Sequence, residues 1–223
     1  MKKIVVVGYK GKMGSVVFET LKAQGFNVFG KDKEDDFDCF CDVSLVIDFG
    51  GADSSVESAN WCKKHKVNLI VGSTGQTESE MQQIKSVAEH VAVMIAGNFS
   101  VGVLMMKKMI ELMRFCEVED VCVFEKHHKH KLDAPSGTAK ELQAQIEKQL
   151  FKTPQILSVR GGQEVGTHTI DFYFGSEVIE ISHKAFSRDA FAKGVVLAVL
   201  FMQKVTGCGE FCFEDVFFKC DKL

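Results

Sequence analysis

Short apolar stretches alternate with amphipathic stretches along the first 100 residues. The apolar run at residues 4–7 ends at a glycine, and it is followed by Met13, Val16, Val17 and Leu21, which are spaced to share one face of a helix. Strands that alternate with helices in this way build parallel sheets, because each helix returns the chain to the same edge. We therefore predict an α/β fold with a Rossmann-like, doubly wound parallel sheet, whose helices cover residues 13–23, 54–64 and 78–89.

The pattern changes after residue 100. A helix is predicted at 101–115, a strand at 121–128 and a second helix after a polar loop, and the alternation across 168–185 favours antiparallel strands that are open on one side. From Arg188 the chain is helical and strongly apolar again. We predict an inserted, smaller α+β substrate-binding and oligomerisation domain at 101–187, and a dinucleotide-binding domain formed by residues 1–100 and 188–223.

Composition excludes several classes of protein. Of the 223 residues, 46% are hydrophobic and 26% are charged, as in ordinary globular proteins, and the net charge of −3 predicts binding to neither nucleic acid nor membranes. The apolar run at 4–7 is too short for a signal segment or a spanning helix, so we expect a cytoplasmic protein. The eight cysteines are scattered and are interpreted as reduced thiols, since Cys39 and Cys41 lack a second pair at metal-ligand spacing.

Three glycines follow the first strand. Gly8, Gly11 and Gly14 form a variant of the GxGxxG fingerprint, in which glycines allow a tight turn and a close approach to a pyrophosphate at the start of a helix. Lys10 and Lys12 add positive charge. A glycine-rich turn without a ligand is the alternative, but the strand–turn–helix context favours a nucleotide site.

Residues at later strand ends extend this site. Asp32 is the best-placed carboxylate for a ribose, while Lys31 and Lys33 could attract a 2′-phosphate, so NADH and NADPH both remain open. Two segments of small residues should flank the nicotinamide. The predicted cofactor-binding residues are Gly8, Tyr9, Lys10, Gly11, Lys12, Met13, Asp32, Gly72, Ser73, Thr74, Ala96, Gly97, Asn98 and Phe99.

The segment EKHHKHKLDAPSGTAKELQ at 125–143 is the densest in reactive side chains. Three histidines and three lysines within 126–131 would repel one another unless an anion or solvent screens them. Ser136, Gly137 and Thr138 open a helix, with Thr138 and Glu141 at capping-box spacing, and free amides at a helix start bind carboxylates. This predicts a site for a small dicarboxylate. Metal binding by His127, His128 and His130 is the competing interpretation, but adjacent strand residues face opposite ways and the lysines oppose a cation, so we expect no metal.

This segment resembles the signature E-x-HHxHKxDAPSGTA of the dihydrodipicolinate reductase family of bacterial and plant lysine biosynthesis. The resemblance also covers VVGYKGKMG, LVIDF, GSTG, AGNFSVGV and SHKAFSRDAFAKG, and so spans nearly the whole chain. The chain is shorter than many members, particularly before the third strand and between Arg160 and His168.

The resemblance implies a function. Members reduce 4-hydroxy-tetrahydrodipicolinate to tetrahydrodipicolinate with NADH or NADPH, with loss of water, in the lysine and diaminopimelate pathway. It implies that His127 is the general acid/base and Lys131 its catalytic partner. His128, Gly137 and Thr138 correspond to substrate-binding positions, beside Ser136 at the same helix start. A homotetramer is also implied.

Two other functions can be weighed against this one. An amino-acid dehydrogenase of the same architecture would need carboxylates to receive an ammonium, which the HHKHK cluster opposes. A non-catalytic nucleotide sensor would tolerate the loss of His127 or Lys131, and both are present.

Overall fold

The computed structural model describes residues 2–218 and divides into two compact units. Unit 1 joins the residues up to Phe99 with those from Phe191 onward, and unit 2 spans Ser100–Ala190. Unit 1 contains the doubly wound parallel sheet that the sequence predicts, and unit 2 contains a separate mixed sheet. We describe each unit by itself.

Unit 1 is built on a six-stranded parallel sheet in the order β10-β5-β4-β3-β1-β2. β2 lies on one side of β1 and β3 on the other, so the direction of winding reverses between β1 and β3. Ligands of such sheets bind at the carboxyl ends of the strands where this reversal occurs. The strands are β1 Lys3–Val7, β2 Val28–Lys31, β3 Val43–Asp48, β4 Asn68–Val71, β5 Ala92–Ile95 and β10 Gly209–Phe211.

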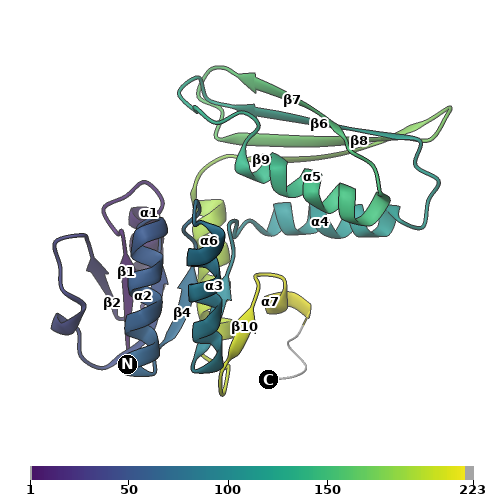
Figure 1. The fold of residues 1–223 in the computed structure, drawn as a ribbon. Coiled ribbons are helices and arrows are strands. Elements are labelled where there is room, and N and C mark those ends of the chain that lie inside the picture. Colours follow the sequence, from purple (N-terminus) through teal and green to yellow (C-terminus); the bar gives the residue numbers. More distant parts are fainter. Residues whose placement is uncertain (1, 219–223) are drawn as a thin grey trace. The chain divides into compact units, whose positions relative to one another are not determined.

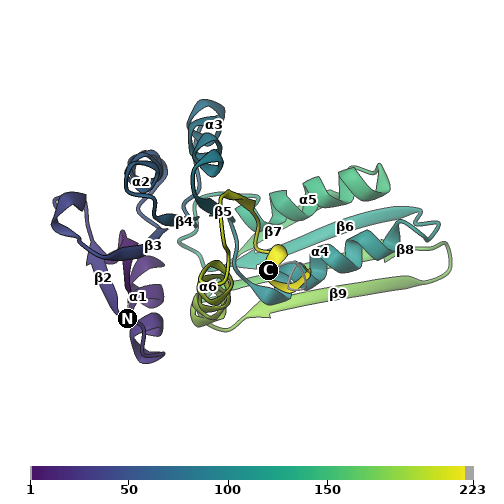
Figure 2. The ribbon, with the colours of Figure 1, turned by 90° about the horizontal axis from the view of Figure 1, so that it is seen from below.

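Helices cover both faces of this sheet. Figure 2 shows α2 and α3 on one side and α1 and α6 on the other. The predicted helix at 78–89 ends as an α-helix at Ser86 and continues as a short 3-10 turn, and the last strand and last helix were not predicted. The helices are α1 Gly14–Ala23, η1 Phe37–Cys39, α2 Ala52–His65, α3 Glu78–Ser86, η2 Val87–Glu89, α6 Asp189–Met202 and α7 Asp215–Phe218.

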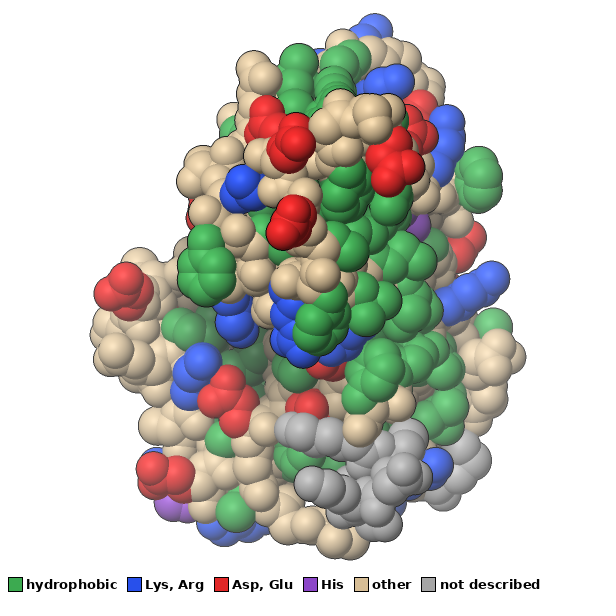
Figure 3. All heavy atoms as spheres, turned by 90° about the vertical axis from the view of Figure 1, so that its right-hand side faces the viewer, with side chains coloured by type: hydrophobic (Ala, Val, Ile, Leu, Met, Phe, Trp, Pro, Cys, Tyr) green, Lys and Arg blue, Asp and Glu red, His purple; other side chains and the backbone are tan. Residues whose placement is uncertain are grey.

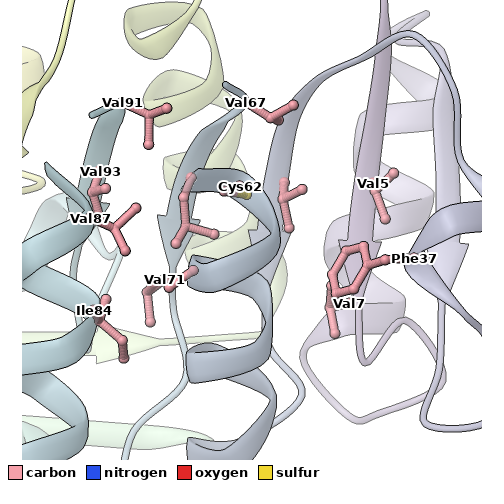
Figure 4. Packing of buried hydrophobic residues seen from close by; sticks show 13 residues of the cluster. Val5, Val7, Phe37, Cys62, Val67, Val71, Ile84, Val87, Val91 and Val93 are labelled. Atoms are coloured by element: carbon pink, nitrogen blue, oxygen red, sulfur yellow. The ribbon is translucent and has the colours of Figure 1, made fainter. Parts of the chain in front are cut away.

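One hydrophobic core cluster of unit 1 lies between the sheet and the helices α2 and α3 (Figure 4). Valine dominates this cluster, because strands covered on both faces need apolar side chains throughout, and β-branched residues suit extended backbone. Val5 and Val7 of β1 are buried here together with Cys62 of α2. Seven cysteines lie within residues 2–218 and all are free thiols, while Cys220 lies outside the described residues.

Unit 2 contains a four-stranded sheet in the order β7-β6-β8-β9. The pairs β6–β8 and β8–β9 are antiparallel, as predicted, whereas β7 pairs with β6 in parallel, which was not predicted. Both helices of the unit lie on the same side of the sheet (Figure 1). The elements are α4 Val101–Met113, β6 Asp120–His127, α5 Gly137–Leu150, β7 Gln155–Arg160, β8 Gly166–Tyr173 and β9 Val178–Ala185.

The covered face of this second sheet changes character along the strands. Val121 and Val123 of β6 pack with Ile170 and Phe172 of β8 against the two helices. Because alternate strand residues share a face, the same face continues into polar side chains toward the carboxyl end of β6. There Ser158, Glu125, His168 and His183 are register neighbours across the four strands. This polar end of the sheet holds the candidate site residues of unit 2.

Among residues 2–218, no helix combines the length and the apolar character needed to cross a membrane.

Candidate active site

A pocket of about 310 Å³ lies at the point in unit 1 where the winding of the sheet reverses. Gly8 follows β1, and Gly50 and Gly51 follow β3, so backbone forms much of its wall. The pocket is lined by Val7, Gly8, Lys31, Asp32, Lys33, Gly50, Gly51, Ala52, Asp53, Ser54 and Glu57.

The three predicted glycines form a turn, and at two of them, Gly8 and Gly14, a side chain would clash with backbone. Gly8 has φ +73°, and a Cβ there would lie 2.7 Å from the Cα of Gly50. A Cβ on Gly14 would lie 2.1 Å from the carbonyl oxygen of Gly8, so α1 can start this close to β1 only with glycine. Among the described residues no side chain caps the start of α1, which leaves its positive end for an anion.

Charged side chains of the turn and of β2 meet beside this pocket. Lys10 Nζ lies 3.4 Å from Asp32 Oδ2, and the amide of Lys33 donates to Asp32 Oδ1 at 2.9 Å. The hydrogen bond from the Lys33 amide and the charge of Lys10 lower the pKa of Asp32, so this half-buried carboxylate is ionised at neutral pH. Lys31 is buried, with Nζ 3.4 Å from Glu57 Oε1. Carboxylates and lysines therefore both reach the predicted ribose site.

A second pocket of about 320 Å³ adjoins the first, since Gly51 lines both. Gly8 lines the first pocket and Met13 the second, so the turn that contains Tyr9, Lys10, Gly11 and Lys12 connects the two. Ala96 precedes Gly97 at the end of β5. The second pocket brings seven of the predicted cofactor residues together with Phe49, Gly51 and Phe191: Met13, Gly72, Ser73, Thr74, Gly97, Asn98 and Phe99.

Asp48, at the end of β3, links the loops around both pockets. Its fully buried carboxylate accepts hydrogen bonds from Ser54 (3.0 Å) and Ser58 (2.5 Å) of α2, and from Ser73 (2.5 Å) after β4. The amide of Gly50 donates to it at 3.1 Å. The sequence analysis did not predict Asp48, Gly50 or Gly51 as site residues. The run DFGG at the end of a strand could have indicated a ligand-binding loop there.

In unit 2, His127 lies beside a buried carboxylate. Its Nδ1 is 2.5 Å from Oε2 of Glu125, which is two residues earlier on the same face of β6. Arg160 of β7 donates to both oxygens of Glu125, at 2.9 and 2.7 Å. A bidentate arginine–carboxylate pair is strong and fixed in direction, so these three side chains form one rigid cluster.

The charges in this cluster follow from burial and hydrogen bonding. Burial by itself would raise the pKa of Glu125, but hydrogen bonds from Arg160, Ser158 and His127 outweigh it and lower the pKa to about 2. Burial lowers the pKa of His127 more than Glu125 raises it. Burial, with the nearby His127 ring, lowers the pKa of His168 to about 4. At neutral pH the carboxylate is therefore ionised and both imidazoles are neutral.

Lys131 lies on the loop between β6 and α5. Its Nζ forms an ion pair with Asp133 at 2.7 Å, which lowers the pKa of Asp133. The same loop is tied to the cluster, because Arg160 also donates to the carbonyl oxygen of Asp133 at 2.5 Å. The peptide bond before Pro135 is cis. A single arginine thus contacts both the Glu125–His127 pair and the loop that carries Lys131.

The start of α5 differs from the prediction. The capping box predicted for Thr138 and Glu141 is wrong: the N-cap is Ser136, whose hydroxyl accepts from the Ala139 amide at 3.2 Å. Glu141 instead forms an ion pair with Lys107 of α4. The N-cap lies two residues earlier than predicted, because the hydroxyl of Ser136 can reach the first-turn amides. The backbone amide of Ser136 donates to Glu125 at 3.3 Å.

Two histidines of the sheet, the buried His168 and the half-buried His183, contact helix N-caps. His168 Nε2 is 3.1 Å from the hydroxyl of Ser136, and His183 Nε2 is 3.3 Å from the hydroxyl of Ser100, which caps α4. The ring of His168 also stands edge-on to that of His127, with centroids 5.1 Å apart. Sequence reasoning missed the roles of His168, Glu125 and Arg160. Period-two alternation along the strands could have placed them on one face, but the parallel β6–β7 pairing could not be foreseen.

The fold and the glycine turn together define a class, the NAD(P)H-dependent oxidoreductases with a Rossmann-type dinucleotide unit. A second unit with buried histidines and a lysine loop accompanies it here.

The chain belongs to the dihydrodipicolinate reductase family. The family model for the N-terminus of dihydrodipicolinate reductase matches residues 2–99, and that for the C-terminus matches residues 102–217. This confirms the resemblance carried by the sequence motifs.

Relatives and solved structures agree. The chain is 32% identical to a 4-hydroxy-tetrahydrodipicolinate reductase of Thermosipho africanus, over 95% of both chains, and 31% identical to one of Archaeoglobus fulgidus, over 96% of this chain and 98% of that one. The fold is similar to that of the dipicolinate-bound dihydrodipicolinate reductase from Paenisporosarcina sp. TG-14, with a TM-score of 0.79 at 22% identity, covering 95% of this chain and 98% of that one. The Archaeoglobus alignment runs over 254 positions, more than the 223 residues here, so that relative carries insertions.

Proposed function

We propose that the protein reduces 4-hydroxy-tetrahydrodipicolinate to tetrahydrodipicolinate, with loss of water, at the expense of NADH or NADPH, in lysine and diaminopimelate biosynthesis. The observation that carries this proposal is the His127–Glu125–Arg160 cluster beside the Lys131 loop, in a chain of this family that also has a dinucleotide turn. In this assignment unit 1 binds the cofactor and unit 2 binds the substrate.

The residues of unit 1 fit a dinucleotide. The Gly8–Gly14 turn has no room for side chains at Gly8 and Gly14, and at Gly11 a Cβ would meet just the Gly8 carbonyl oxygen, at 3.1 Å. Backbone amides there and the uncapped start of α1 would hold a pyrophosphate. Asp32 would bind a ribose, and the pocket that begins at Met13 would take the nicotinamide. When bound, the cofactor supplies the hydride.

Unit 2 offers groups that bind a dicarboxylate. Lys131 can pair with one carboxylate of the substrate while it shares the contact with Asp133, as a charge-assisted hydrogen bond. Gly137 is exposed, and a Cβ there would meet no atom within 4 Å, so a ligand can approach the backbone at the start of α5. The positive end of α5 favours an anion at Gly137 and Thr138, with His128 beside it. A dipicolinate-bound relative of the same fold supports a dicarboxylate ligand.

His127 and Lys131 provide for proton transfer. Loss of water and reduction of one ring double bond by hydride both require protons to be moved, and a neutral imidazole can accept one while an ammonium can donate one. His127 is neutral at pH 7 because burial lowers its pKa. We assign His127 as the general acid/base and Lys131 as its partner. Both amide and hydroxyl of Ser136 are engaged within unit 2, so its part is to fix the start of α5.

We also propose that the protein is a homo-oligomer, a tetramer by family resemblance. The face of the second sheet opposite α4 and α5 exposes Leu157, Val159, Tyr173 and Val178, each between 37% and 51% accessible. Figure 3, which looks from the right-hand side of Figure 1 and does not face this side of the sheet, shows other hydrophobic side chains at the surface. Exposed apolar residues on a sheet face favour association between copies. Light scattering coupled to gel filtration measures the subunit number, and a monomer at micromolar concentration would contradict the proposal.

The test of the function is a turnover assay. Substrate generated enzymatically is mixed with the protein and either NADH or NADPH, and oxidation of the cofactor is followed by absorbance. We expect oxidation that depends on substrate and is inhibited by dipicolinate. A folded protein that binds the nucleotide but oxidises neither cofactor in the presence of substrate would refute the proposed reaction.

A further inference from the structure

Glu125 is a fully buried carboxylate to which the proposed proton transfer assigns no step of its own. It lies at the polar end of the second sheet, in register with Ser158 on one side and His168 on the other. One of its oxygens contacts Nδ1 of His127, and both accept hydrogen bonds from Arg160. Burying a charge is costly, so its presence beside a proposed catalytic histidine calls for an explanation.

The hydrogen-bonding chemistry of Glu125 determines where His127 carries its hydrogen. An ionised carboxylate can accept hydrogen bonds and cannot donate them. The contact between Glu125 Oε2 and His127 Nδ1 is therefore possible for a neutral imidazole if the hydrogen is on Nδ1. The lone pair must then lie on Nε2, the other ring nitrogen.

We propose that Glu125 is the positioning residue of His127: its carboxylate holds the neutral imidazole as the Nδ1–H tautomer, so that Nε2 is the nitrogen that exchanges protons with the substrate. The inference rests on the proposed function, in which His127 is the acid/base. A carboxylate in this place also stabilises the imidazolium that forms when Nε2 takes up a proton.

Neighbouring groups restrict both side chains to this arrangement. Arg160 and the amide of Ser136 occupy the oxygens of Glu125, so the carboxylate cannot rotate away. The ring of His168 stands edge-on to His127, and His168 is held in turn by Ser136. At Gly166 a Cβ would come within 3.0 Å of His127 Nε2, so glycine keeps that nitrogen clear.

The test compares the wild type with Glu125→Gln. Glutamine has nearly the same shape, but its amide can either accept from Nδ1–H or donate to a bare Nδ1, so the tautomer is no longer dictated. We expect kcat to fall by about 100-fold or more, while the KM for NADH and the dissociation constant of dipicolinate change by less than about threefold. Glu141→Gln is the matched control, because it removes a carboxylate from an ion pair of the same unit that does not touch His127.

Nitrogen-15 NMR of the imidazole rings gives a readout that a merely structural role would not move. We expect wild-type His127 to show a protonated Nδ1 and a bare Nε2 at neutral pH, and Glu125→Gln to show a mixture or the opposite pattern. If Glu125→Gln fails to fold, the double variant Glu125→Gln/Arg160→Met, which removes both charges, is measured in the same way.

The outcomes separate this proposal from the proposed function. Because the NMR pattern is recorded in the resting protein, it tests the positioning of His127 even if the wild type has no reductase activity, which would refute the function alone. A wild-type kcat in Glu125→Gln would overturn the positioning role. So would a loss of kcat with the same His127 pattern in both proteins, since Glu125 would then support the fold alone.

Discussion

The two units each bury a carboxylate at the end of a central strand, and the two are satisfied in different ways. Asp48 in unit 1 receives its hydrogen bonds from serine hydroxyls and an amide, all neutral groups. Glu125 in unit 2 is bound by the guanidinium of Arg160 and by His127. Neutral donors fix backbone loops without placing further charge near a ligand, whereas a charged network sets the protonation of a reactive side chain. The difference matches the assigned roles of holding a dinucleotide and moving protons.

We expect the largest effect on the buried carboxylate of unit 2 when Arg160 is replaced. Arg160→Met leaves the Glu125 carboxylate buried without its cation, which costs about 3–5 kcal/mol of unfolding free energy. Urea unfolding measures it. Restoring charge balance in Arg160→Met/Glu125→Gln should recover part of that loss, and an Arg160→Met protein with the wild-type urea midpoint would show that the pair contributes nothing.

Acid should destabilise unit 2 before it affects Glu125. The pKa of His168 is about 4 in the folded protein against 6.5 for a free histidine, so the unfolded chain binds more protons below pH 6.5. The free energy of unfolding therefore decreases as the pH is lowered. This difference between the folded and unfolded pKa values of His168 is equivalent to about 3 kcal/mol of unfolding free energy, which is lost progressively between pH 6.5 and 4. Glu125, with a lowered pKa, adds its own loss only below pH 4.5. Unfolding at pH 7 and 5 tests this window.

The variant His168→Gln tests whether His168 causes the loss of stability in this pH range. It should flatten the dependence of stability on pH between 6.5 and 5, because glutamine takes up no proton there. An unchanged slope in the variant would assign the effect to other groups, of which His127 and His183 also have pKa values lowered by burial.

Lys131→Ala should separate substrate chemistry from cofactor binding. Loss of one charge-assisted contact in the transition state predicts a decrease in kcat/KM of about 100-fold, equivalent to about 2.7 kcal/mol. Affinity for NADH should be unchanged. Lys129→Ala is the control on the same loop, since Lys129 is exposed. Normal turnover combined with lost NADH affinity in Lys131→Ala would contradict the assignment of this lysine to the substrate site.

Gly11→Val tests whether the backbone of the glycine turn in unit 1 binds the pyrophosphate. Gly11 lies outside the left-handed region and a Cβ there meets one protein atom, so the fold should tolerate valine. The branched side chain would occupy space beside the pyrophosphate, which predicts about 30-fold weaker NADH binding, equivalent to about 2 kcal/mol. Calorimetry measures the affinity. Unchanged binding by a folded variant would reduce the turn to a structural feature.

The candidate sites of the two units were unequally predictable from the sequence. The dinucleotide site of unit 1 depends on local signals, because glycines after a strand and small residues at strand ends are adjacent in the chain. The site of unit 2 depends on pairing between distant strands: Arg160 reaches Glu125 only because β7 adds in parallel to β6, and His168 faces Glu125 only in one register. The sequence did not predict Gly50 and Gly51 as pocket residues, because two glycines after a strand are as typical of an ordinary loop as of a ligand pocket.

The central claim is that unit 1 governs cofactor affinity and unit 2 governs the chemical step, and a crossed measurement on the two buried carboxylates tests it most directly. For Asp48→Asn, whose new amide hydrogens face serine hydroxyls, we expect the NADH dissociation constant to rise about tenfold while kcat at saturating NADH changes by less than about threefold. For Glu125→Gln we expect the reverse pattern, with kcat lost and NADH affinity kept. If both variants lose kcat and NADH affinity together, or if the pattern is the opposite, the division of labour between the two units is contradicted.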